Sequence, residues 1–248
     1  MTIERLLARR GRVLLAVLGV TLAALAAPQP ARAVLPPDGG TITVTARDVT
    51  ASNEKVAMAY AALAAMWRTE FRQAGARFVV PDIVRYRGAA RSRCGVMDAG
   101  NAFYCPDDNA IYYDEVFVAA QAKRAARTLG TDGDMAAIGV VAHEMGHAVA
   151  MQLGVVSPYP YENEAIADCL AGAFARQAAH DGSLERGDVE EAFYAMSTAG
   201  DPTPRLTGNR RVDRVLLTRA ALLGHGTREQ RMHNFDAGLE GGPAACLR

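Results

Sequence analysis

The sequence lacks several features that would each assign it to a class of protein. Its four cysteines include no Cys-x-x-C pair, so a zinc site built from cysteine pairs is not expected. Basic and acidic side chains balance at 27 each, which gives no indication of nucleic-acid binding. No apolar run reaches the roughly 20 residues that a membrane-spanning helix needs. Internal repeats and low-complexity tracts are also absent, which favours an ordinary globular domain.

The longest apolar run lies near the N-terminus and predicts an export signal. Residues 13–27 follow a basic stretch and precede an Ala-Arg-Ala motif that ends at residue 33, as in a cleavable signal peptide. An uncleaved N-terminal anchor is the alternative. Cleavage would leave a mildly acidic chain, periplasmic or secreted, without membrane contact. The expected organisation is a signal peptide (1–33), a linker or extended segment (34–52) and one domain (53–248).

Export determines how the four cysteines are interpreted. In an oxidising compartment disulfides are expected, and four cysteines allow three pairings. We favour Cys94–Cys105, because these residues flank a short glycine-containing loop, and this choice leaves Cys169–Cys246. Loop-closure entropy assigns about 3 kcal/mol to the short loop and about 4.5 kcal/mol to the long one. Four free, buried thiols are the alternative.

The hydrophobic pattern predicts a mostly helical α+β domain with a small antiparallel sheet. Apolar residues recur at three- and four-residue steps over residues 53–74, which indicates an amphipathic helix. Residues 102–105 and 110–113 flank a Pro-Asp-Asp-Asn turn and predict a hairpin. Asp114 is the expected N-cap of the next helix. Further helices are expected at about 134–153, 162–180, 187–198, 210–223 and 227–238, the last with Thr227 and Gln230 as a capping box.

The most informative motif is the segment His143-Glu144-Met145-Gly146-His147, inside the predicted helix 134–153. Residues four apart project from one face of a helix, so both imidazoles can bind one metal ion. Glu144 lies about 100° around the helix from His143, where it can reach a water molecule on that metal without being a ligand.

A second motif, Asn163-Glu164-Ala165-Ile166-Ala167-Asp168, offers a third ligand. Glu164 and Asp168 lie one helical turn apart and share a face. If Glu164 binds the metal, Asp168 can accept the remaining N–H of a bound imidazole and fix its tautomer. The residues favour a zinc site with an open position for water. Two helices that carry these residues without a metal are the alternative.

The two motifs together resemble the gluzincin pattern, and more of the chain resembles the bacterial "putative neutral zinc metallopeptidase" family. That resemblance implies a zincin-like domain with one Zn²⁺ per chain, bound by His143, His147 and Glu164. It also implies that Glu144 is the catalytic base and that Asp168 supports a bound imidazole. The other matching blocks are Cys94-Gly95, Phe103-Tyr104-Cys105-Pro106, Ile111-Tyr112-Tyr113-Asp114, Ala167-Asp168-Cys169-x-Ala171-Gly172, Gly187-Asp188-Val189-Glu190-Glu191-Ala192 and His225-Gly226-Thr227-x-x-Gln230-Arg231.

These observations lead us to expect an exported zinc peptidase that acts on a peptide or protein substrate. Glu144 would take a proton from the attacking water and deliver it to the leaving amine. The donor to the developing oxyanion is His225, Tyr159 or Tyr161, and we favour His225 because it lies in a family-like block. The resemblance also suggests that the 102–113 hairpin pairs with an extended peptide.

Two other functions fit parts of the same pattern. An inactive zinc-binding scaffold would hold a peptide or partner protein without cutting it, but such a scaffold has no need of Glu144. A zinc hydrolase of the cell envelope that is not a peptidase would use the same chemistry on a different ester or amide.

Overall fold

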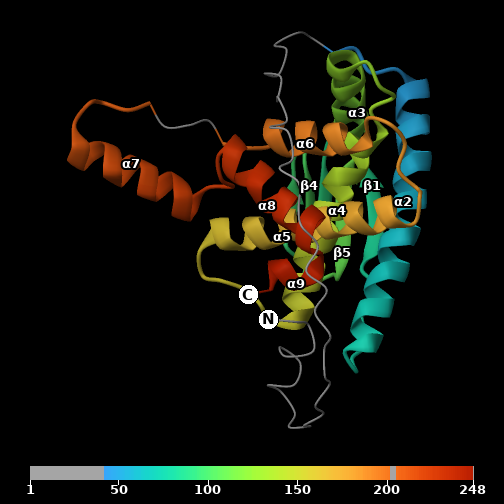
Figure 1. Cartoon of the computed structure of the whole chain (residues 1–248). Coiled ribbons are helices and arrows are strands. Elements are labelled where there is room, and N and C mark those ends of the chain that lie inside the picture. The colour runs from blue at the N-terminus through green and yellow to red at the C-terminus, as the bar shows by residue number, and fades with distance from the viewer. Residues whose placement is uncertain (1–41, 202–204, 248) are drawn as a thin grey trace.

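The computed structural model describes residues 42–201 and 205–247, which form a mostly helical α+β fold (Figure 1). The expected signal peptide lies outside these residues. Among the described residues no helix is both long and apolar enough to cross a membrane. The helices are α2 (Ala46–Gln73), α3 (Glu115–Leu129), α4 (Asp134–Leu153), α5 (Pro160–His180), α6 (Asp188–Thr198), α7 (Arg210–Leu223), α8 (Arg228–Gly241) and α9 (Pro243–Cys246). The strands are β1 (Asp82–Tyr86), β2 (Ala90–Ser92), β3 (Gly95–Met97), β4 (Ala102–Cys105) and β5 (Ala110–Asp114).

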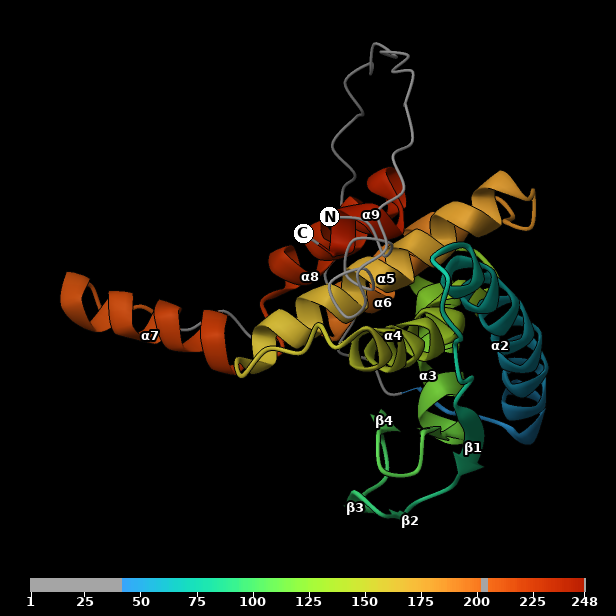
Figure 2. The same ribbon diagram turned by 90° about the horizontal axis from the view of Figure 1, so that it is seen from below.

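The elements are layered around α4, the helix that carries the two histidines. Seen from below, α4 lies between the strands and α5, while α8 and α9 cover the far side of α5 (Figure 2). Helix α2 lies along one flank, and α7 projects away from the body in both views (Figures 1 and 2). The centre of the molecule is thus the pair α4–α5, which contains both metal-binding motifs.

The three-stranded sheet is mixed, whereas the sequence pattern predicted an antiparallel one. The predicted hairpin is confirmed, since β4 and β5 pair antiparallel around a turn in which Asn109 adopts a φ of 46°. Strand β1, however, pairs parallel with β5 and gives the order β1-β5-β4. Because β2, β3 and β4 lie between β1 and β5 in the chain, the pairing of β1 with β5 is non-local and needs no hairpin. Strand β4 is consequently an edge strand of this sheet.

Helix α2 begins at Ala46, seven residues before the expected start. Thr45 and Asp48 form a complete capping box, in which each side chain accepts a hydrogen bond from the other residue's backbone N–H. Part of the segment expected to be a linker is therefore helical. Two predicted caps are confirmed: Asp114 caps α3, and Thr227 and Gln230 form the capping box of α8.

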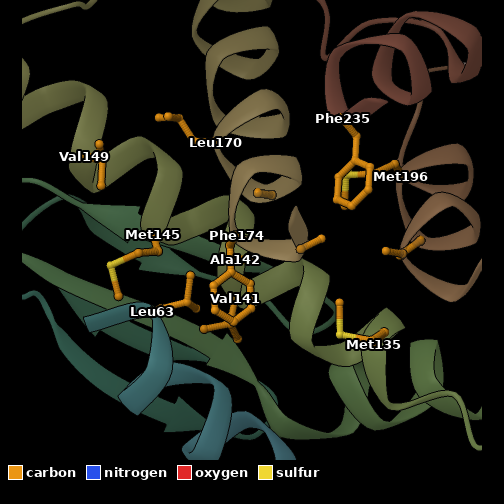
Figure 3. Close-up of a cluster of buried hydrophobic side chains, with 14 of the residues drawn as sticks. Leu63, Met135, Val141, Ala142, Met145, Val149, Leu170, Phe174, Met196 and Phe235 are labelled. Carbon is orange, nitrogen blue, oxygen red and sulfur yellow. The ribbon is translucent and has the colours of Figure 1, made fainter. Parts of the chain in front are cut away.

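The core surrounds α4, which is apolar on almost all sides as its sequence predicted. Side chains from α2, α4, α5, α6 and α8 converge there, among them Leu63, Val141, Phe174, Met196 and Phe235 (Figure 3). Both expected disulfides are present, Cys94–Cys105 and Cys169–Cys246. The second joins α5 to α9 and so fixes the C-terminal end of the chain against the helix of the second motif.

Candidate metal centre

Three side chains from α4 and α5 meet at the predicted metal site. The Nε2 atoms of His143 and His147 lie 3.1 Å apart. One carboxylate oxygen of Glu164 lies 3.1 Å from His143 Nε2, and the other lies 3.5 Å from His147 Nε2. Two nitrogens and a carboxylate thus point at one another, as the spacing of the two motifs predicted.

The separations between these atoms match those required by a zinc ion. With zinc–ligand bonds of about 2.0–2.1 Å, neighbouring ligands of a tetrahedral site lie roughly 3.3 Å apart. The three observed separations, from 3.1 to 3.5 Å, bracket that value. Two imidazoles and one carboxylate also form a known donor set of catalytic zinc sites, which leave the fourth position open. The residues therefore fit a catalytic zinc ion.

Gly146 explains why α4 and α5 approach closely enough to form this site. A Cβ atom at this position would lie 2.8 Å from the carbonyl oxygen of Ala167 and 2.9 Å from its Cα atom. Only glycine permits such an approach between the two helices. His147 and Glu164, each near the crossing point, are brought into contact as a result.

The buried carboxylate of Asp168 holds the far side of the His143 ring. Its Oδ1 atom lies 2.9 Å from His143 Nδ1, and the side chain is fully buried. A carboxylate is only an acceptor, so Nδ1 must carry the proton and Nε2 is the nitrogen available to a metal. This is the arrangement that the sequence predicted for Asp168.

Arg231 is part of the site, and sequence reasoning gave it no role. Its Nε donates to Asp168 Oδ2 at 3.0 Å and its Nη2 to Asp168 Oδ1 at 2.5 Å. Its Nη1 donates to the carbonyl oxygen of Ala199 at 3.1 Å. Arg231 lies in one of the blocks that resemble the family, and this resemblance was the only sequence feature that pointed to it. Nothing in the local pattern places it beside Asp168, 63 residues earlier.

The electrostatics of the site favour a positive charge between the carboxylates. Burial and the Arg231 cation lower the pKa of His143, but hydrogen bonds with Asp168 and Glu164 outweigh them and raise it to about 10. Burial likewise opposes ionisation of Glu164, yet the hydrogen bonds from His143 and His147 hold its pKa well below the usual range. Without a metal, a proton on His143 supplies the charge that the carboxylates stabilise.

A groove of about 580 Å³ runs past the three candidate ligands. Glu144 lines it beside His143, as the 100° offset on the helix predicted. Residues Ala102, Phe103 and Tyr104 of β4 line the groove as well, which places the edge strand beside the metal site. The base candidate, the ligands and three residues of an edge strand thus line one cavity.

His225 also lines the groove, at the start of the loop that leads into α8. Its side chain is 66% exposed, and its Nδ1 lies 3.5 Å from a carboxylate oxygen of Asp201. Its backbone N–H donates to the other oxygen of Asp201 at 2.6 Å. Tyr159 and Tyr161 do not line the groove. Of the three candidate oxyanion donors, His225 is the one that lines the groove.

A second acidic cluster lies away from this site and has structural partners. Asp132, Asp134, Asp188 and Glu191 have carboxylate oxygens close enough to hold a cation. Lys55, however, forms ion pairs with both Asp134 and Asp132. Glu191 accepts two backbone N–H groups at the start of α4, at 2.8 Å each. Asp188 accepts the backbone N–H of Glu185. Because each carboxylate of the cluster already has a partner, we assign no metal to it.

Comparison with known proteins identifies the family of the chain. The family described as "Putative neutral zinc metallopeptidase" matches residues 13–247. Two curated relatives, from Escherichia coli strain K12 and from Escherichia coli O6:H1 strain CFT073, are both described as "Uncharacterized protein YpfJ". Each is 34% identical over 197 residues, which cover 73% of this chain and 65% of the relative. The chain thus spans slightly less than two thirds of these relatives. No solved structure matches it.

Proposed function

Since the chain belongs to the "Putative neutral zinc metallopeptidase" family, we propose that it is an exported zinc peptidase with its active centre between α4 and α5. His143, His147 and Glu164 hold one Zn²⁺ per chain, and the domain has the zincin type of organisation. The observation that carries the proposal is the convergence of these three side chains at the separations of a tetrahedral site.

The residues around the site have distinct roles in the proposed hydrolysis. When bound, zinc supplies Lewis-acid chemistry, which makes a water molecule acidic near neutral pH and polarises a carbonyl group. Glu144 accepts the proton of that water and transfers it to the leaving amine. His225, at the rim of the groove, donates to the oxygen that becomes negative. Asp168 keeps the proton of His143 on Nδ1, so that Nε2 stays free for the metal.

The position of β4 supports an extended peptide as the substrate. Strand β4 pairs with β5 on one edge only, and three of its residues line the groove beside Glu144. A peptide that adds to the free edge as another strand gains main-chain hydrogen bonds whatever its sequence. Side chains along the groove then set any preference for particular residues.

The disulfides support export to the periplasm or the medium. All four cysteines are paired, and none is free among the described residues. Disulfides persist in oxidising compartments and are rare in the cytosol. The N-terminal segment 1–33 would be the signal that directs the chain there.

The test is hydrolysis of an unstructured protein such as casein by the purified exported chain. Glu144→Gln is the decisive variant, because it removes the base and keeps all three ligands. We expect peptide products from the natural protein, none in the presence of a chelator, and none from Glu144→Gln. Zinc content, measured by atomic absorption, should remain near one per chain in the variant.

Other outcomes of this experiment would contradict the proposal. A protein that carries zinc but cleaves neither casein nor a library of peptides would be a scaffold or an envelope hydrolase. Full activity of Glu144→Gln would exclude Glu144 as the base. A natural protein without stoichiometric zinc would exclude the metal centre itself.

A further inference from the structure

We propose that Arg231 is a positioning residue for the metal centre: it clamps Asp168, and through Asp168 it orients His143 for the metal. This inference rests on the proposed zinc site and extends it to a residue of α8. Arg231 would not touch the metal, and its effect would appear as a change in metal affinity.

The guanidinium group holds Asp168 at two points. Nε and Nη2 donate to different carboxylate oxygens, a two-point contact that fixes the plane of the carboxylate as well as its position. Lysine cannot reproduce this contact, because its ammonium group is a point charge without a planar fork. Asp168 Oδ1 therefore has one orientation in which to receive the N–H of His143.

A close approach of two donors shows that Asp168 is shared. Arg231 Nη2 lies 3.2 Å from His143 Nδ1, and both atoms carry protons. They do not bond to each other. Each donates to the same Asp168 oxygen, at 2.5 Å from Arg231 and 2.9 Å from His143. A displacement of the guanidinium would release the carboxylate and with it the ring.

Burial explains why Asp168 needs the arginine. Its side chain is fully buried, and one imidazole N–H cannot satisfy two carboxylate oxygens. An unsatisfied buried carboxylate is costly, and Arg231, itself only 4% exposed, supplies two further donors and the opposite charge. The charges of Arg231 and Asp168 offset each other, and Arg231 Nη2 also lies 3.9 Å from a carboxylate oxygen of Glu164.

The position of Arg231 is itself fixed by close helix packing. A Cβ atom at Gly172 of α5 would lie 1.9 Å from the carbonyl oxygen of Phe235, and one at Gly238 of α8 would lie 1.8 Å from that of Cys169. Glycines on both helices therefore allow backbone contact between α5 and α8. This packing fixes the position of the start of α8 along α5, so that Arg231 lies beside Asp168.

The experiment compares Arg231→Met with Arg176→Met in the full chain. Arg176, on α5, donates to the carbonyl oxygens of Leu239 and Glu240. It also joins α5 to α8, but it does not contact Asp168. Arg176→Met is therefore a control for the loss of a side-chain contact between these two helices. Arg231→Lys keeps the charge without the fork and provides a second variant if Arg231→Met does not fold.

Three measurements test the proposal on metal-free protein and on protein reloaded with metal. They are the zinc dissociation constant from chelator competition, the visible spectrum of the Co²⁺-loaded protein, and thermal unfolding of the metal-free protein. We expect Arg231→Met to weaken zinc binding by about 10- to 100-fold and to alter the Co²⁺ spectrum. Arg231→Lys should also weaken binding, and Arg176→Met should leave the zinc dissociation constant unchanged.

A double variant separates a positioning role from a general structural one. If Arg231 acts through Asp168, adding Arg231→Met to Asp168→Asn should weaken zinc binding by less than the product of the two single effects. Unchanged zinc affinity in both Arg231 variants, or fully multiplicative effects, would overturn the inference. Failure of the natural protein to bind zinc would instead overturn the proposed function, so the two failures are distinguishable.

Discussion

Among the residues of the site, His143 has a pKa that is subject to opposing effects. Burial and the nearby guanidinium of Arg231 oppose a positive charge on its ring. Asp168, beside Nδ1, and Glu164, beside Nε2, stabilise that charge. The raised pKa shows that the carboxylates prevail. A site that stabilises a proton so strongly is arranged for a cation, and a metal at the same place must displace that proton.

The expected consequence is proton release when the metal-free protein binds zinc. With a pKa of about 10, His143 is protonated at pH 7, and only its neutral form binds the metal. Zinc affinity should therefore rise with pH, by up to about tenfold per unit from this group, until the pH nears 10. Calorimetric titration in two buffers of different ionisation enthalpy measures the protons released. Binding enthalpies that do not depend on the buffer would contradict the expectation.

The same shift gives the stability of the metal-free protein a defined pH dependence. The folded-state pKa of His143 lies above the ordinary value of 6.5, so its charge stabilises the fold fully below about pH 6.5. This contribution is lost as the pH rises through about 10. Asp168→Asn lacks one of the two carboxylates that raise the pKa of His143. At pH 7, fewer protons should therefore be released when this variant binds zinc.

The sequence predicts some residues of the site and not others for a simple reason. His143 and His147 share a helix turn, as do Glu164 and Asp168, so their arrangement follows from helix geometry alone. The role of Arg231 depends on the packing of α8 on α5, which brings together residues 63 positions apart. Periodicity contains no such information. The role of His225 stays a prediction, since its position on the groove leaves open what it donates to.

At the scale of the secondary-structure elements, the crossing of α4 and α5 depends on the absence of a side chain at Gly146. Gly146 lies where the helices touch, within the H-E-x-x-H motif, while Gly139 lies two turns earlier on the same helix. A Cβ at Gly139 would meet only the methyl group of Met196 at 3.6 Å and the Cβ of Ala195 at 3.9 Å, both ordinary contacts. The two glycines therefore form a matched pair for testing the crossing.

We expect Gly146→Ala to destabilise the protein and to weaken zinc binding. Its methyl group would force α5 away from α4 at a cost of about 1–3 kcal/mol, and would separate His147 from Glu164. Gly139→Ala should be neutral or stabilising by up to about 1 kcal/mol, since alanine favours the helix. Denaturant unfolding and zinc competition measure both effects. Equal behaviour of the two variants would mean that the crossing does not require glycine.

The secondary structure shows the same division between local and non-local signals. The β4–β5 hairpin and the caps of α3 and α8 follow from residues within a few positions of one another, and each was predicted. The parallel pairing of β1 with β5 joins segments separated by β2, β3 and β4, and the prediction of an antiparallel sheet was wrong for β1. The early start of α2 had a local signal in Thr45 and Asp48, which the sequence analysis overlooked.

At the scale of the whole molecule, the apolar core and the metal centre are adjacent but distinct. The buried hydrophobic cluster draws on side chains of α2, α3, α4, α5, α6, α8 and β5, whereas the three candidate ligands are polar. The Cys169–Cys246 disulfide adds a constraint on the C-terminal end that does not depend on metal. The fold should therefore persist without zinc, in contrast to small domains that unfold when their metal is removed.

Removal of zinc should lower the melting temperature without unfolding the protein at 25 °C. A ligand that binds only the folded state stabilises it by about 4 kcal/mol when its free concentration is 1,000 times the dissociation constant. For a domain of this size each kcal/mol corresponds to roughly 2–4 °C, so chelation should lower the melting temperature by about 8–16 °C. Circular dichroism, recorded with chelator and after zinc is restored, measures the shift. Glu144→Gln should show the full shift, because Glu144 is not a ligand, whereas Glu164→Gln should lose most of it. Loss of the near-ultraviolet signal at 25 °C in chelator would show instead that the core depends on the metal.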